Sequence, residues 1–225
     1  IDFNSIRVNN SGHEANTIMN APRRRRDAGA TRQRILQAAA QLLARNEGAL
    51  EMSWVSKEAQ VSQGLAYHHF GSREGLLEAV VNDFYDRLEA EVLMANFSEI
   101  DAWEKRETRR SERYIAFLTE DPLGPTLMNK LSQTPAVAAL EAKRWRKLVT
   151  EGARNIGDGQ RRGTVGSRDD PALLAAMVLG AMRSAVVNAL QEGGVEKPGD
   201  LNRDIWRFLR AGLQIKEERS DAAEN

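Results

Sequence analysis

The stretch from Glu51 to Arg73, EMSWVSKEAQVSQGLAYHHFGSR, constrains the fold of this chain more than any other. It predicts a first short helix, because three apolar residues recur at helical spacing along one face: Met52, Val55 and Ala59. Ser62 can cap a second helix by accepting from the free backbone N–H groups of its first turn, and Gly71 ends that helix. Two short helices joined by a tight turn are typical of a DNA-reading helix-turn-helix.

The second helix, predicted from Gln63 to about His69, begins with side chains suited to a major groove. Gly64 and Ala66 keep its N-terminal end slim. Gln63 can donate to and accept from one base edge at once, most naturally that of adenine.

The rest of this helix divides into an apolar and a polar side. We expect Leu65 and Phe70 to turn into the core. Tyr67 and His68 then face outward and can donate to phosphate oxygens, as can Arg73 after the turn; such contacts set register rather than read sequence. The alternative is an ordinary helical hairpin with a polar outer face, because a single Ser-x-Gly turn is common.

Two longer segments contain this pattern, TRQRILQAAAQLLARNEG and VSKEAQVSQGLAYHHFGSREGLLEAVV. Together they resemble the N-terminal domain of the TetR family of transcriptional regulators, from Thr31 to about Leu88. The resemblance implies an all-α homodimer that binds double-stranded operator DNA and releases it when a small molecule fills the C-terminal domain.

The resemblance also implies which residues contact DNA: Ser62, Gln63, Gly64, Tyr67, His68 and Arg73, with Trp54 and Lys57 on the preceding helix. The glutamine and the glycine would approach bases, and the other side chains would approach the phosphate backbone. Two positions depart from the family pattern. Glu51 stands where a Thr or Ser cap is usual, and Ala66 stands where a bulkier apolar residue is usual.

The chain has 225 residues with 32 basic and 32 acidic side chains, and it contains no cysteine. A neutral overall charge is compatible with DNA binding, because only the field at the contact surface matters. The lack of cysteine excludes disulfides and thiolate chemistry. No apolar run approaches the roughly 20 residues that span a bilayer, and no signal-peptide pattern opens the chain, so we expect a cytoplasmic protein without a membrane partner.

Composition and helical periodicity divide the chain into four parts. Residues 1–30 are polar and predict a disordered tail, in which residues 1–18 resemble an upstream remnant ahead of Met19. Arg23–Arg26 could form an arm on DNA or could be a solvated charge run. Residues 31–75 form the helix-turn-helix domain, and a long helix from Ser72 to about Met94 links it to residues 76–216, a ligand-binding and dimerisation domain. Residues 217–225 are a charged tail.

The last two predicted helices, 171–192 and 199–215, are candidates for a homodimer interface. The first is apolar nearly all round from Leu173 to Leu190, so it should be covered on both faces. Pairing with its copy as a four-helix bundle would cover it; burial of both helices within one chain is the alternative. The glycine-rich segment 156–167 before them predicts a flexible surface connection.

No catalytic or metal-binding grouping stands out, so we expect neither an enzyme nor a cofactor. His68 and His69 are adjacent and do not face each other on a helix, and no acid lies at ligand spacing around them. Aromatic and sulfur-containing residues of the C-terminal part are more often plain core, but a subset could line an effector pocket between helices. The candidates are Trp103, Tyr114, Phe117, Met128, Trp145 and Met177.

The sequence therefore predicts an all-α, homodimeric, sequence-specific transcriptional regulator, a repressor that a small molecule releases from an inverted-repeat operator. One alternative is an architectural DNA-binding protein of the same fold without a ligand. An all-α enzyme, and a module that binds another protein through its apolar helices, are further alternatives.

Overall fold

The computed structural model describes residues 15–95, 97, 100, 102–194 and 197–216, with side chains from residue 28 onward. Its helices in chain order are α1 (Ala15–Arg45), α2 (Met52–Glu58), α3 (Gln63–Phe70), α4 (Arg73–Leu88), the π-helical turn η1 (Glu89–Leu93), α5 (Trp103–Glu120), α6 (Gly124–Asn129), the 3-10 turn η2 (Leu131–Gln133), α7 (Pro135–Arg161), α8 (Pro171–Gln191) and α9 (Pro198–Leu213). Among these residues, extended backbone pairs as one isolated antiparallel bridge between Val165 and Ile215. The predicted all-α fold is confirmed.

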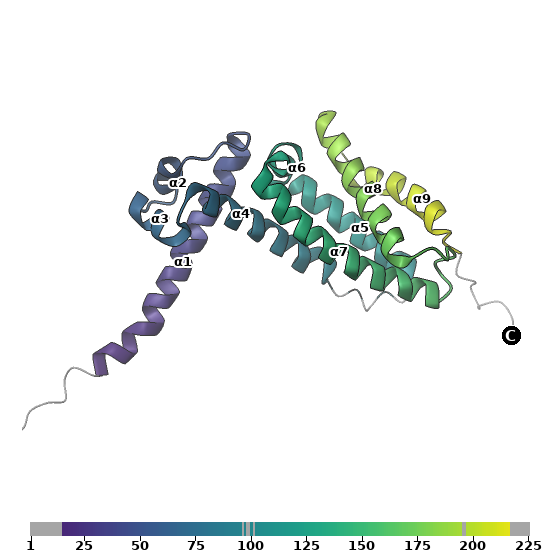
Figure 1. Cartoon of the computed structure of the whole chain (residues 1–225), viewed down its shortest axis with the longest axis horizontal. Helices are drawn as coiled ribbons and strands as arrows, with labels where there is room; N and C mark the ends of the chain where they lie inside the picture. The colour runs from purple at the N-terminus through teal and green to yellow at the C-terminus, as the bar shows by residue number, and fades with distance from the viewer. Residues whose placement is uncertain (1–14, 96, 98–99, 101, 195–196, 217–225) are drawn as a thin grey trace, which may run out of the picture.

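The first three helices and the front of α4 share one hydrophobic core. α1 contributes a buried apolar stripe whose members are each at most 8 % exposed: Ile35, Leu36, Ala39, Leu42 and Leu43. Val55 from α2 and Leu76 and Val80 from α4 belong to the same cluster. Figure 1 shows α1, α2 and α3 gathered at one end of the molecule, with α4 leaving them toward the other helices.

α1 begins earlier than the sequence predicts. Residues 15–30 are helical rather than disordered, so the expectation of a disordered tail is wrong for this part of the chain. A helix that is already nucleated gains one hydrogen bond for each residue added, and the Ala and Arg residues frequent here favour helix. Residues 1–14 and 217–225 lie outside the described part, as do the side chains of Arg23–Arg26.

α4 connects the two halves of the molecule. Ser72 caps its start by accepting from the backbone N–H of Gly75 at 2.9 Å, as N-cap serines do. The helix passes without a break into η1, so one helical rod runs from Arg73 to Leu93. It packs against α1 near its start and against α7 farther along, and η1 packs against α5.

The first half of the glycine-rich segment 156–167 is helix rather than a flexible connection. α7 runs on to Arg161. Gly159 lies where a β-carbon would come within 2.6 Å of Val165 and 2.9 Å of Trp103, so glycine permits a close approach of side chains to α7 instead of ending the helix. Gly163, with a φ of 77°, makes the turn that follows.

α8 and α9 carry apolar side chains that the chain itself leaves exposed. Leu173 and Met177 on α8 are 56 % and 61 % exposed, and Phe208 on α9 is 69 % exposed. α8 is also long and apolar enough to cross a membrane, with a mean hydropathy of 1.7 over its most apolar stretch, of which 22 % is buried. The expectation that no run approaches such a length is therefore wrong, although a helix that pairs with another subunit has the same composition.

Candidate nucleic-acid interface and ligand cavity

The α2–α3 turn has the local structure that the sequence predicts. The hydroxyl of Ser62 accepts from the backbone N–H of Leu65 at 3.2 Å and caps α3. Gly71 follows the helix with a φ of 75°, a value that suits glycine because it lacks a β-carbon. Glu51 makes no side-chain cap on α2, in keeping with its departure from the family pattern.

α3 turns one small residue fully into the core. Ala66 is completely buried, and Phe70, one turn later, packs against the same core. Leu65 is 37 % exposed, so the expectation that it points inward is wrong. Adjacent residues point about 100° apart around a helix. Because Ala66 points into the core, Leu65 points partly toward solvent.

The outward side of α2 and α3 forms an exposed surface, which we call the α3 face. Its members are Trp54, Lys57, Gln63, Gly64, Tyr67 and His68. Arg73 is an exposed neighbour at the start of α4, where Nε donates to the carbonyl of Leu50 at 2.8 Å and Nη1 donates to Glu74 at 2.9 Å. These bonds orient its guanidinium before any partner arrives.

No contact among the described residues requires a glycine at position 64. A β-carbon at Gly64 would meet no other atom within 4 Å, and the residue lies in the first turn of α3. Glycine in a helix costs about 0.5–1 kcal/mol relative to alanine. Glycine is the residue that lets backbone approach another molecule closely, so the α3 face has the form of a contact surface.

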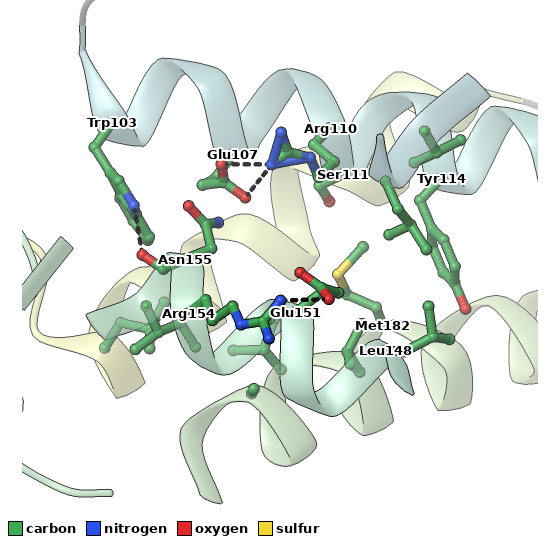
Figure 2. Close-up of a pocket in the computed structure, with 18 of the residues that line it drawn as sticks. Trp103, Glu107, Arg110, Ser111, Tyr114, Leu148, Glu151, Arg154, Asn155 and Met182 are labelled. Atoms are coloured by element: carbon green, nitrogen blue, oxygen red, sulfur yellow. Dashed lines mark hydrogen bonds and ion pairs between the residues drawn. The ribbon is translucent and has the colours of Figure 1, made fainter. Parts of the chain in front are cut away.

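A cavity of about 420 Å³ lies among η1, α5, α7, α8 and α9. Its volume is within the range of small-molecule pockets, roughly 300–1,000 Å³. Figure 2 shows the labelled residues of α5 facing those of α7 across it. The apolar lining includes Val92, Leu93, Met94, Trp103, Tyr114, Leu148, Ile156, Val178, Leu179, Met182, Trp206 and Leu213, and the polar lining includes Glu107, Arg110, Ser111, Glu151, Arg154 and Asn155.

Two of the six residues proposed from sequence as pocket lining, Trp103 and Tyr114, border this cavity. The other four lie elsewhere: Phe117 and Met128 pack in the core, Trp145 is on α7 outside the lining, and Met177 is on the exposed side of α8. Helical spacing identifies the inward stripe of a helix. It does not tell which inward residues border a hole, because that depends on the neighbouring helices.

Sequence reasoning missed the polar group in the cavity wall. Nη1 of Arg110 donates to both carboxylate oxygens of Glu107, at 2.8 and 3.1 Å, and Glu107 also has a side-chain hydrogen bond with Asn155 of α7. Burial raises the pKa of Glu107, and the charge of Arg110 offsets part of that effect. A Glu–Arg pair three residues apart is ordinary on a helix surface, so no signal in the sequence marked it as internal.

Polar side chains also connect α7 to the rod formed by α4 and η1, and we call this contact the α4–α7 seam. Arg144 of α7 donates to Asn82, Asp86 and Glu89, each at 2.8 or 2.9 Å. Lys147, one turn later, pairs with the same Glu89. The cavity-lining residues of α7 begin directly after these two, so one helix serves both the seam and the cavity.

A second polar group joins the seam to the cavity wall. The hydroxyl of Tyr85 on α4 donates to Glu141 of α7, and Arg183 of α8 pairs with the same carboxylate at 2.8 Å. Tyr114, which lines the cavity, is buried near these charges, and burial raises its pKa to about 12. Burial also raises the pKa of Tyr85, and the charge of Glu141 adds to that effect, so both phenols remain protonated at neutral pH.

The helix-turn-helix region resembles a known family of proteins. Residues 35–80 match the family model of bacterial regulatory proteins of the tetR family. The HTH-type transcriptional regulator UidR of Escherichia coli is 24 % identical over 166 residues, which cover 68 % of this chain and 78 % of that protein.

Solved structures share the fold beyond that region. AibR in complex with isovaleryl coenzyme A and operator DNA is 18 % identical, with a TM-score of 0.61 over 79 % of this chain and 97 % of that one. FadR of Bacillus subtilis in complex with stearoyl-CoA is 16 % identical, with a TM-score of 0.65 over 80 % of this chain and 98 % of that one. The matching helix-turn-helix region, the similar regulator and the shared fold together support a transcriptional regulator of the TetR family.

Proposed function

We propose that this protein is a homodimeric repressor that binds an inverted-repeat operator through two α3 faces and leaves it when a small molecule fills the cavity. The main support is the α3 face, a capped and exposed helix whose first turn presents Gln63 and the bare backbone of Gly64. Gln63 fits an adenine edge in the major groove. As a regulator of this kind, the protein acts in the cytoplasm.

The remaining residues of the site contact the phosphate backbone in this proposal: Ser62, Tyr67, His68 and Arg73, with Trp54 and Lys57 from α2. Such contacts fix the register and orientation of a protein on DNA without reading sequence. The free N–H groups at the start of α3 favour a phosphate in the same place.

Two copies of the chain would pair through α8 and α9. The exposed side chains of Leu173, Met177 and Phe208 support this pairing, because a partner subunit would remove them from water. A two-fold dimer presents its α3 faces to two half-sites of opposite orientation, about one helical turn or a multiple of it apart.

Ligand release would act through the rod formed by α4 and η1. Val92 and Leu93 of η1 border the cavity, and the other end of the same rod packs against α1. A ligand that fits better when this rod is displaced shifts the population toward dimers whose α3 faces no longer match the half-sites. Coupling of about 1–3 kcal/mol, or 5- to 150-fold in operator affinity, is typical. AibR, of the same fold, was solved with both isovaleryl coenzyme A and operator DNA.

The test begins with an operator selected from random duplex DNA by the purified dimer. Gln63→Ala should relax base preference at one position of each half-site, by about 1–3 kcal/mol of discrimination. Tyr67→Phe should weaken binding to all sequences alike, because it removes a phosphate contact. Gln41→Ala, an exposed glutamine on α1 outside the α3 face, is the matched control. Unchanged affinity and preference in both site variants would show that the α3 face does not read DNA.

A further inference from the structure

We propose that the cavity holds an apolar carboxylic acid, with its carboxylate bound by the guanidinium of Arg110. This inference rests on the proposed function, since it names the chemical class of the effector. Three features of the cavity support it: the donors of Arg110, the chemistry of the Glu107–Arg110 pair, and the apolar surface on either side of that pair.

The polar wall has more donors than it has acceptors to receive them. A guanidinium carries five N–H donors in a planar fork. Both contacts of Arg110 with Glu107 use Nη1, so that carboxylate leaves Nη2 without a bond, and the Arg110 side chain borders the cavity. Nε is enclosed within the protein, so Nη1 and Nη2 are the donors that a ligand carboxylate can reach, and such charge-assisted hydrogen bonds are strong.

The pair itself can adapt to an incoming anion but not to an incoming cation. Burial raises the pKa of Glu107, so this carboxyl can take up a proton when a ligand carboxylate competes for Arg110. Arginine does not lose its proton in proteins. A cationic ligand would therefore leave Arg110 charged and without its partner, whereas an anionic ligand replaces that partner.

Two other polar groups of the wall already have partners within the protein. The indole N–H of Trp103 donates to the carbonyl of Asn155 at 3.1 Å, and Ser111 donates to Asn202 at 2.5 Å. These two donors are therefore not free to bind a ligand.

Apolar side chains flank the polar pair on both sides. Figure 2 shows Trp103 toward one end of the cavity and Tyr114 and Met182 toward the other, with Glu107 and Arg110 between them. The cavity therefore suits one anionic group on a hydrocarbon or aromatic body.

Calorimetry on the DNA-free dimer tests this with decanoate, decanol and decylamine, each below its micellar concentration, and with 4-phenylbutyrate as an aromatic acid. We expect wild-type protein to bind the better of the two acids roughly tenfold or more tightly than the alcohol or the amine. Arg110→Met should remove that preference while decanol binding stays the same. Glu107→Gln should strengthen acid binding, because it removes the competing carboxylate. Arg146→Met, exposed on α7 outside the cavity, is the control.

Several results would overturn the inference. These are equal or tighter binding of decanol or decylamine, no binding of either acid, or a preference that survives Arg110→Met. Should that variant not fold, Arg110→Lys keeps the charge but not the planar fork, and acid binding as tight as in wild type would have the same meaning. Operator affinity of the ligand-free dimer is measured in parallel by fluorescence anisotropy. Operator binding without acid binding overturns only the effector class, whereas no operator binding overturns the proposed function.

Discussion

Gly64 is the residue at which stability and DNA binding are expected to oppose each other. Gly64→Ala places a methyl group in open space on a helix, so the free energy of unfolding should rise by about 0.5–1 kcal/mol. The same methyl group would stand between the backbone and the bases, so operator affinity should fall. Urea unfolding and fluorescence anisotropy measure the two effects.

Gly157→Ala is the control, because it also adds a methyl group on a helix, α7, outside both the α3 face and the proposed dimer interface, and its nearest atom lies 3.5 Å away. We expect a neutral or slightly stabilising effect and unchanged operator affinity. If Gly64→Ala behaved in the same way, DNA would not approach the start of α3 closely.

Gly159 is expected to show the opposite behaviour, because its position is crowded. A β-carbon there would lie 2.6 Å from Val165 and 2.9 Å from Trp103, so Gly159→Ala should lower the free energy of unfolding by about 1–3 kcal/mol. Gly157→Ala, two residues earlier on α7, meets its nearest atom at 3.5 Å and should be neutral or slightly stabilising. Thermal and urea unfolding compare the two, and equal effects would contradict the crowding.

Individual residues were predictable where the cause is local. The cap at Ser62 was predicted because a hydroxyl before a helix finds the free N–H groups of its first turn. The direction of Leu65 and the internal Glu107–Arg110 pair were not, because each depends on what the rest of the fold places beside it. A charged pair at helical spacing has the same sequence pattern on a surface and in a cavity.

At the scale of elements, the α4–α7 seam is expected to hold the rod in place. Arg144→Met removes the side chain that donates to Asn82, Asp86 and Glu89. We expect the free energy of unfolding to fall by about 1–3 kcal/mol and amide hydrogen exchange to rise along the rear half of α4.

Lys143→Met is the control for this experiment, since its exposed side chain is the immediate neighbour of Arg144 on α7. It should leave both stability and exchange unchanged. Equal exchange in the two variants would mean that apolar packing alone positions α4.

The order of the helices was predictable, whereas two of their ends were not. Apolar residues at helical spacing predicted the inward side of α2, where Met52, Val55 and Ala59 are buried. The early start of α1 and the late end of α7 were not predicted, because a composition rich in polar residues or glycine predicts disorder or a loop. In the structure, α1 continues as helix back to Ala15, and close packing at Gly159 keeps α7 helical, so both outweigh the local preferences.

At the scale of the whole molecule, Phe208→Asp should separate the dimer. Burying a phenylalanine contributes about 1.5–3 kcal/mol per subunit, and a charge in the same place would have to be desolvated. Light scattering should report a monomer at concentrations where wild type is dimeric, and operator affinity should fall with it. Arg146→Asp, on exposed α7, should remain dimeric; a dimeric Phe208→Asp would show that α9 does not form the interface.

The family and the all-α architecture could be predicted from sequence because one stretch of chain contains both the turn and its flanking helices. The cavity could not be predicted, because five elements distant in sequence enclose it. Phe117 and Trp103 are both aromatic residues of α5 that pack against a hydrophobic core, yet only Trp103 of the two borders the cavity.

The apolar composition of α8 has a consequence for synthesis of the protein in the cell. A newly made subunit that has not met its twin carries a helix that lipid would accept by length and composition. The rate of pairing rises with the square of the subunit concentration, whereas the rate of capture by a lipid surface or a chaperone rises in proportion to that concentration. Assembly, rather than operator affinity, would then set the lowest copy number at which such a protein can work.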